Sequence, residues 1–231
     1  MTGVPLTLRR SRYGADLVVL AAVAVLLAFY YVGRADMIGV SSATRGWVAM
    51  TLRAVPGWAH FAGAALLLGV LPVMAARALT GLSLRELGLG LGNVRAGLLL
   101  LAGGTPLAIL AGAIGASSPA MRAVYPLFPG AASGGFAGYA VMQFLYFGAW
   151  EVLFRGVLLF GLRPTVGGTT ANVLQTALSV TAHFGRAINE TASALPAGLM
   201  FGWADLRLGS IWYVAILHWI VGVSMDWCIL H

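Results

Sequence analysis

The sequence has little charge and almost no cysteine. Only 9% of its 231 residues are charged, lysine is absent, and the acidic residues number seven, whereas about a quarter of the residues in a soluble domain are charged. The single cysteine, Cys228, excludes an internal disulfide and a cysteine-rich metal site. Hydrophobic residues make up 60% of the chain and the mean hydropathy is +0.89, which predicts a membrane protein.

The apolar residues fall into runs that are separated by connections rich in arginine, proline or glycine. Because a helix needs about 20 apolar residues to cross the hydrocarbon core, these runs predict an all-α, polytopic transmembrane helix bundle of about seven spans (six to eight). The fourth run is too long for one ordinary span, so we expect its later part to bend, to re-enter or to follow the interface. Nothing marks a soluble second domain, so residues 1–231 are expected to form a single membrane domain. The spans are expected within residues 17–33, 54–76, 96–116, 134–162, 169–184, 191–203 and 210–230.

The connections between the runs carry their own signals. Residues 34–53 are expected to form a polar connection, and residues 117–135, with several prolines and glycines, a loop. The stretch Ser83-Leu-Arg-Glu86 has the spacing of a helix-capping box, and the leucines around it share one face, so we expect a short amphipathic helix lying in the membrane interface. The segment 205–209, Asp-Leu-Arg-Leu-Gly, predicts a tight turn between the last two spans.

Small residues mark places where helices are expected to lie close together. The run 96–116 is rich in glycine and alanine, and Gly198 and Gly202 are four residues apart in the sixth run. Small side chains at such spacings let two helix backbones approach closely in a membrane. We therefore expect tight helix packing at both places.

All 14 of the strongly basic residues are arginines, and the formal net charge is +7. In a soluble protein this charge would suggest nucleic-acid binding, but here most arginines lie between apolar runs, where they set topology and contact lipid headgroups. Alternating the connections places eight arginines on the side of the N-terminus and five on the other. This bias favours a cytoplasmic N-terminus, and we expect a multi-pass protein of the cell (inner or plasma) membrane with no nucleic-acid partner.

A few polar residues interrupt the apolar runs. Glu151 and Arg155 are four apart, on one helical face, and His183, His218 and Asp226 lie in later runs. A charged side chain near the bilayer centre costs roughly 2.5–3.5 kcal/mol on insertion scales, so such residues are usually paired and functional. Together they could bind a metal, activate a water and hold an oxyanion, or form a structural pair with packed histidines. The spacing alone does not decide between these alternatives. Because the chain has too few metal-ligating side chains for a tight metal site, we predict no metal and no cofactor.

Three stretches carry a resemblance to a known family. They are Trp150-Glu151-Val-Leu-Phe-Arg155-Gly156, Ser179-Val-Thr-Ala-His183 and His218-Trp-Ile-Val-Gly222. In order and spacing they resemble the motifs of the CPBP family, the CAAX prenyl protease and bacteriocin-processing (Abi) family of intramembrane proteases. The likeness covers a core of about residues 134–231.

The resemblance implies an activity and roles for four residues. The activity is that of an intramembrane glutamic-type endopeptidase, in which a glutamate-activated water attacks a peptide bond. Among the residues that the chain shares with the motifs, the resemblance implies an oxyanion role for His183 and His218 and a structural role for Glu151 with Arg155.

The sequence also departs from the family motifs, most seriously at the base. Where the family has its first glutamate, implied to activate the water, this chain has Trp150, and it has Ser179 for a phenylalanine and Gly222 for an asparagine. The missing base has possible substitutes: Glu151 itself, if its helix is locally bent, or one of the acids outside the motifs, Asp226 and Glu190.

Three functions therefore follow from the sequence as hypotheses. The first is a CPBP-like endopeptidase that acts on a membrane-associated peptide or protein. The second is a family member without catalysis, a possible pseudoenzyme that serves as a binding or scaffold subunit of a membrane complex. The third is a small transporter whose pathway is lined by Glu151, Arg155 and the histidines.

Overall fold

The computed structural model describes residues 12–33, 57–126 and 135–231, and within these ranges the regular elements are helices, with no strand. Two segments, named η, have the wider turns of a π-helix. The prediction of an all-α fold is confirmed. In chain order the elements are α2 (Arg12–Gly33), α4 (Gly57–Ala64), η1 (Ala65–Val70), α5 (Leu71–Thr80), α6 (Val94–Ser117), α7 (Pro119–Arg122), α8 (Phe136–Glu151), η3 (Val152–Phe160), α9 (Gly161–Val166), α10 (Gly168–Ala182), α11 (Ile188–Leu208) and α12 (Trp212–Leu230).

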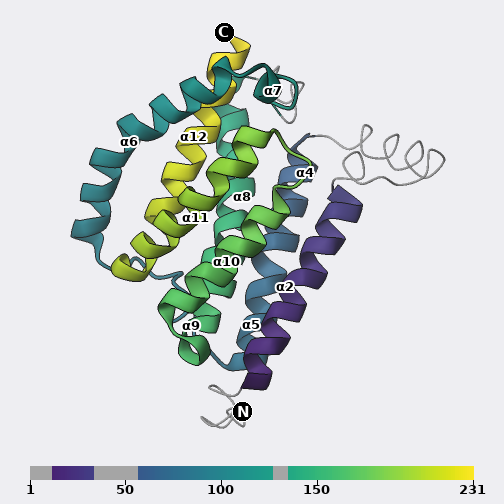
Figure 1. Ribbon diagram of the computed structural model, residues 1–231, viewed down its shortest axis with the longest axis vertical. Helices are drawn as coiled ribbons and strands as arrows, with labels where there is room; N and C mark the ends of the chain where they lie inside the picture. Colours follow the sequence, from purple (N-terminus) through teal and green to yellow (C-terminus); the bar gives the residue numbers. More distant parts are fainter. Residues whose placement is uncertain (1–11, 34–56, 127–134) are drawn as a thin grey trace, which may run out of the picture.

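The long helices run roughly side by side along the length of the molecule (Figure 1). Among the described residues, four helices are long and apolar enough to cross a membrane: Phe61–Thr80, Val94–Ser117, Phe136–Val166 and Trp212–Leu230. The expected membrane character is therefore confirmed. The count of seven spans stays a prediction, because α2, α10 and α11 do not meet the same criteria of length and apolar character over their described residues.

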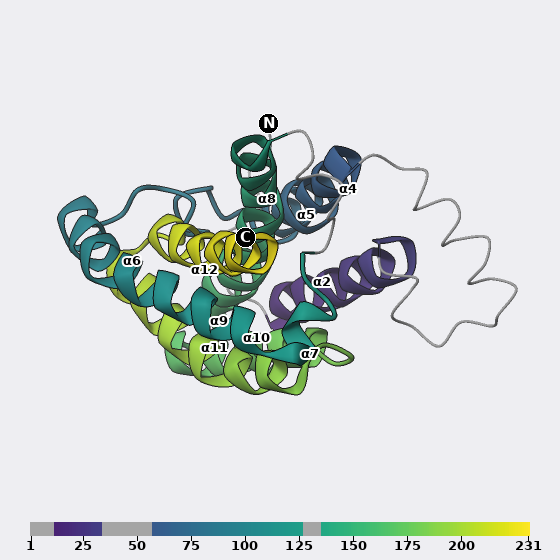
Figure 2. The same cartoon turned by 90° about the horizontal axis from the view of Figure 1, so that it is seen from above.

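The fourth apolar run forms one continuous helix at the centre of the bundle. Elements α8, η3 and α9 join into a helix of 31 residues that includes the π-helical segment. The expected bend, re-entry or course along the interface stays a prediction. In its most apolar window 89% of the residues are buried. Elements α4 and α12 pack against α8 (Figure 2). The segment η1 also packs against α8, and α10 packs against η3. Glu151 and Arg155 therefore lie in the protein interior and do not face lipid.

Small residues allow the close helix contacts that the sequence predicted. A methyl group at Gly198 would lie 2.7 Å from the Thr176 side chain of α10, and one at Gly202 would overlap Asn172 of the same helix. In α6, a methyl group at Gly112 would lie 2.6 Å from the carbonyl oxygen of Val221 in α12. The pairs α10–α11 and α6–α12 are thus held at a spacing that only a hydrogen side chain permits.

The prediction of a short helix in the segment after α5 is wrong, although the capping box predicted there is present. Glu86 accepts hydrogen bonds from the Ser83 backbone N–H (2.8 Å) and hydroxyl (2.7 Å), and the Ser83 hydroxyl accepts one from the Glu86 N–H. The segment then makes a single turn over residues 84–88. Gly88 has a φ of +72°, and a side chain there would lie within 2.5 Å of Phe160. The chain leaves the helical path at this glycine, which lies against Phe160, and the preceding Leu87 is fully buried in the core.

Two other connections also differ from the expectation. The segment predicted as a tight turn at 205–209 is helical as far as Leu208, and α11 ends at Gly209, whose φ of +67° and N–H bond to the Asp205 carbonyl are typical of a helix C-terminus. Residues 117–126 of the expected loop contain the short helix α7. The expected polar connection 34–53 and the N-terminal arginines at positions 9 and 10 lie outside the described residues.

Candidate functional site

Glu151 is the centre of the buried polar cluster. It ends α8 and is fully buried. One of its oxygens, Oε1, lies 2.6 Å from Nδ1 of His218 in α12, and the other, Oε2, lies 3.2 Å from Nε of Arg155 in η3. The structure therefore brings together three of the predicted site residues, from two segments that are more than sixty residues apart.

Arg155 is almost completely buried, with 3% of its side chain exposed. Its guanidinium lies over the ring of Phe201 in α11, 5.8 Å from the ring centroid. Within the described residues neither Nε nor Nη1 has a hydrogen-bond partner, so the guanidinium lies between the Glu151 carboxylate, as an ion pair, and an aromatic face. A buried guanidinium cannot give up its proton, so Arg155 is a fixed positive charge beside Glu151.

His218 is the part of the cluster that reaches toward the outside. Its side chain is 24% exposed, and its ring packs against Phe147 at 4.8 Å and Phe201 at 6.1 Å between centroids. Because a carboxylate oxygen can only accept, Nδ1 carries the proton in this bond. In the neutral ring, Nε2 is then left with a free lone pair.

His183 follows the last residue of α10, and its Nδ1 lies 2.7 Å from the carbonyl oxygen of Ser179. A carbonyl also only accepts, so a neutral His183 likewise keeps its lone pair on Nε2. Among the described residues, no hydrogen bond or ion pair joins His183 to Glu151 or His218. The edge of the Trp150 ring packs on His183, with centroids 5.2 Å apart, and Trp150 is only 4% exposed.

The two acids outside the motifs are placed in other clusters. Asp226 is fully buried, and its Oδ2 accepts hydrogen bonds from the Tyr139 hydroxyl (2.6 Å) and from Gln143 Nε2 (2.5 Å). Asp226 is eight residues from His218 along α12, about 12 Å at 1.5 Å per residue. Within the described residues, neither Asp226 nor Glu190 forms a hydrogen bond or an ion pair with the Glu151 cluster.

Glu190 belongs to a cluster that joins the loop after α7 to the start of α11. Its Oε1 accepts a hydrogen bond of 2.7 Å from the Tyr125 hydroxyl, and the Arg186 guanidinium lies 5.6 Å from the Tyr125 ring centroid. Burial raises the pKa of the Tyr125 hydroxyl well above its ordinary value, so Tyr125 remains a donor to Glu190. This arrangement ties two connections together.

Sequence reasoning missed one buried acid, Asp205. It is fully buried in the last turn of α11, and neither of its carboxylate oxygens has a hydrogen-bond partner among the described residues. The charges that act on it are those of Glu151 and Arg155. A signal was present, because Gly198, Gly202 and Asp205 follow the i, i+4, i+7 spacing of one helix face, and the two glycines already marked that face as packed.

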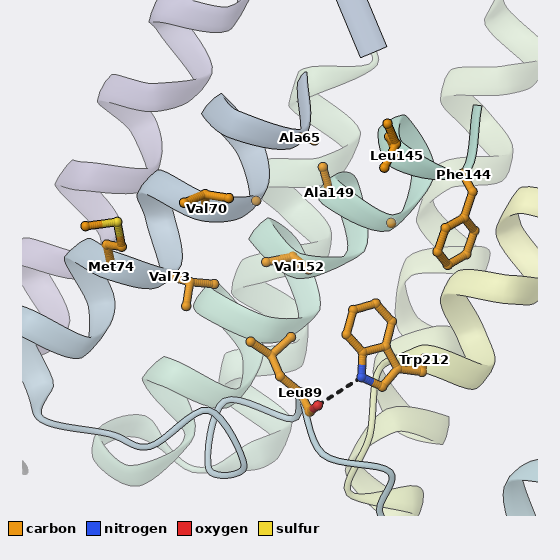
Figure 3. A pocket seen from close by; sticks show the side chains of 12 residues that line it. Ala65, Val70, Val73, Met74, Leu89, Phe144, Leu145, Ala149, Val152 and Trp212 are labelled. Carbon is orange, nitrogen blue, oxygen red and sulfur yellow. Dashed lines mark hydrogen bonds between the residues drawn. The ribbon is translucent and has the colours of Figure 1, made fainter. Parts of the chain in front are cut away.

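Within the described residues, no group of three or more His, Cys, Asp or Glu side chains is placed to hold a metal ion. The polar cluster is also separate from a cavity of about 370 Å³ that opens beside η1, α5 and α8 (Figure 3). That cavity is lined by apolar side chains and by Trp212, whose indole N–H donates to the Leu89 carbonyl at 2.9 Å. None of the predicted site residues lines it, so the candidate chemistry belongs to the buried cluster.

Comparison with known proteins identifies the region that contains this cluster. Residues 132–224 match the family model described as type II CAAX prenyl endopeptidase Rce1-like. This part of the chain is therefore similar to Rce1-like domains. The resemblance to the CAAX protease family drawn from the three motifs is confirmed, and the matched residues include the Glu151 cluster. Comparisons with curated proteins and with solved structures gave no match.

At two positions where the sequence departs from the family motifs, aromatic rings fill the space. Trp150 packs against Phe154, with ring centroids 4.7 Å apart, in addition to His183. At the third motif, any side chain larger than that of Gly222 would overlap the ring of Phe147. The space at both positions is therefore occupied by apolar side chains.

Proposed function

We propose that this protein is a membrane-embedded hydrolase of the Rce1-like type that cleaves a peptide bond in a membrane-associated substrate, with His218 as the base. The observation that carries the proposal is the distance of 2.6 Å between Glu151 Oε1 and His218 Nδ1. The match of residues 132–224 to the Rce1-like family supports the reaction type.

The geometry supports His218 as the group that activates the water, in place of the substitute bases expected from the sequence, Glu151, Asp226 and Glu190. Glu151 is fully buried and both of its oxygens face positive or donating groups, Arg155 and His218. A carboxylate bound to Nδ1–H fixes the tautomer and orientation of an imidazole and stabilises the imidazolium that forms when the ring takes a proton. Glu151 therefore orients the base, and Arg155 holds Glu151 in place.

In the proposed reaction, His218 first accepts a proton from water and then returns it to the leaving amine. His218 Nε2 takes a proton from water as the water oxygen bonds to the peptide carbonyl carbon. The same nitrogen then gives that proton to the amide nitrogen as the carbon–nitrogen bond breaks. General acid–base catalysis of this kind contributes about 10²–10⁴-fold. His183, whose Nδ1–H is bound to Ser179, would supply a second acceptor for the attacking water.

One observation favours a second candidate function, a family member without peptidase activity that acts as a binding subunit of a membrane complex. Trp150 is buried and its ring edge lies on His183, at the position where the resemblance implies the water-activating glutamate. A ring in that place leaves less room for a substrate and a water beside His183.

The test is cleavage of a membrane-peptide library by the full chain in lipid nanodiscs. We expect cleavage by the wild type, a loss of at least about 10²-fold in His218→Ala, and unchanged cleavage in His231→Ala, an exposed histidine at the chain end. Thermal unfolding of each variant checks that it is folded. Absence of cleavage by the folded wild type overturns the proposal, and stoichiometric co-purification of a membrane partner would then support the binding function.

A further inference from the structure

Asp205 is a buried acidic residue without a hydrogen-bond partner, in the region that matches the Rce1-like family model. It is fully buried, and its Oδ1 and Oδ2 both lack hydrogen-bond partners among the described residues. An ionised carboxylate in such a place is very costly unless it is paired and hydrogen-bonded. A buried acid without donors is therefore stable as the neutral form, unless a nearby positive group balances its negative charge.

The charged groups around Asp205 are paired by charge, although Oε2 of Glu151 and Nε and Nη1 of Arg155 have no hydrogen-bond partner among the described residues. Arg155 of η3 and Glu151 of α8 are the charged groups that act on Asp205, and they form an ion pair at 3.2 Å. Of the histidines in the site, His218 of α12 donates to Glu151 and His183 of α10 donates to a backbone carbonyl. One positive charge thus faces two carboxyl groups.

Charge balance then fixes the number of protons in this cluster. With Glu151 ionised, Arg155 positive and both imidazoles neutral, an ionised Asp205 would leave a net charge of −1 in a buried centre. The centre is neutral when it holds one further proton, either on Asp205 or on His218. Asp205 has no donor that would stabilise its anion, whereas a neutral His218 already satisfies Glu151 through Nδ1–H.

We infer that Asp205 holds this proton, and that it is a positioning residue that keeps the buried centre neutral and His218 in its basic form. An ionised Asp205 would draw the proton to His218 and remove the lone pair on Nε2. The consequence for catalysis rests on the proposed function, but the protonation of Asp205 does not, and it can be measured whether or not the protein cleaves peptides.

The experiment is infrared difference spectroscopy of the full chain in nanodiscs, comparing the wild type with Asp205→Asn. We expect the variant to lose a protonated-carboxyl C=O band that the wild type has at neutral pH. Asparagine keeps the shape and neutrality of the protonated acid, so we also expect Tm to change by less than about 4 °C, the effect of roughly 1 kcal/mol in a chain of this size. Glu86→Gln, at an exposed turn, is the control that should leave the band intact.

Two results would overturn the inference. One is a spectrum in which Asp205→Asn keeps every protonated-carboxyl band of the wild type. The other is a variant that fails to fold or loses far more than 4 °C of Tm, since either outcome means that Asp205 is an ionised partner of Arg155. If Asp205→Asn loses the protonated-carboxyl band while the wild type cleaves no peptide, this inference stands and the proposed function is rejected.

Discussion

The two buried acids beside Arg155 should show strong coupling when they are changed together. Glu151→Gln keeps a carbonyl oxygen for His218 Nδ1–H but removes the charge that faces Arg155 at 3.2 Å. At an effective dielectric constant of 20, two unit charges at this distance attract by about 5 kcal/mol. Breaking a buried pair by removing one partner typically costs about 3–5 kcal/mol, because the remaining charge is uncompensated.

The single variant should nevertheless lose less than this, because Asp205 can respond. Once Glu151 is neutral, Arg155 is the one fixed charge of the centre, and Asp205 can give up its proton to balance it. We therefore expect Glu151→Gln to cost about 2 kcal/mol, and Glu151→Gln combined with Asp205→Asn to cost the full 3–5 kcal/mol. Since Asp205→Asn alone is expected to be nearly neutral, the coupling is about 1–3 kcal/mol, within the range for residues in one network.

The assay is thermal unfolding of the four proteins of this cycle in the same nanodiscs. At about 2–4 °C per kcal/mol for a chain of this size, the double variant should lose about 6–20 °C of Tm. The infrared spectrum of Glu151→Gln should also lose the protonated band of Asp205. Additive losses within about 0.5 kcal/mol would refute the reasoning, since they would mean that Asp205 never compensates for Glu151.

Two further predictions test the packing and the second polar cluster. Gly112→Ala should destabilise the protein by about 1–3 kcal/mol through overpacking. The control is Gly103→Ala in the same helix, where nothing lies within 4 Å of the new methyl group, and it should be neutral or stabilise the protein by up to about 1 kcal/mol. Equal Tm shifts in the two variants would contradict the geometry. Tyr139→Phe removes a donor to the Asp226 carboxylate and should cost about 1.5–3 kcal/mol of stability. Tyr213→Phe removes a donor to a neutral backbone carbonyl and should cost less, about 0.5–1.5 kcal/mol. A larger loss in the tyrosine 213 variant would contradict an ionised Asp226.

Contacts between residues close in sequence could be predicted from spacing. The ion pair of Glu151 with Arg155 and the reciprocal bonds of Ser83 with Glu86 are both present. Spacing could not predict how far the helix after Ser83 extends, because its end depends on the contact of Gly88 with Phe160, a residue seventy positions away. Local chemistry therefore predicts local bonds, and tertiary packing decides how long an element is.

The part of the site that joins distant helices was only partly predictable. The two histidines were expected to meet Glu151 because polar groups in apolar runs need partners, and His218 does so. Asp205 was missed because Asp-Leu-Arg-Leu-Gly has the composition of a turn. Its burial follows from the helix face that it shares with Gly202, which packs on α10. A charged residue in a turn-like sequence is thus placed in the interior by the packing of its helix.

The departures from the family motifs are connected by packing, and this decides which substitutions can test the proposed function. Phe147 lies against both His218 and Gly222, and Trp150 lies against His183 one helical turn further along the same central helix. A larger residue at position 222 would need Phe147 to move, and the ring of Tyr146 packs edge-on against Phe147. Changes at the first and third motifs therefore share one set of aromatic neighbours. A glutamate placed at position 150 alone would enter an apolar setting, because the packing of Phe147 would be unchanged. Single substitutions toward the family pattern are therefore poor tests of catalysis. Variants that leave the contacts among Tyr146, Phe147 and Trp150 in place, such as His218→Ala, are better tests.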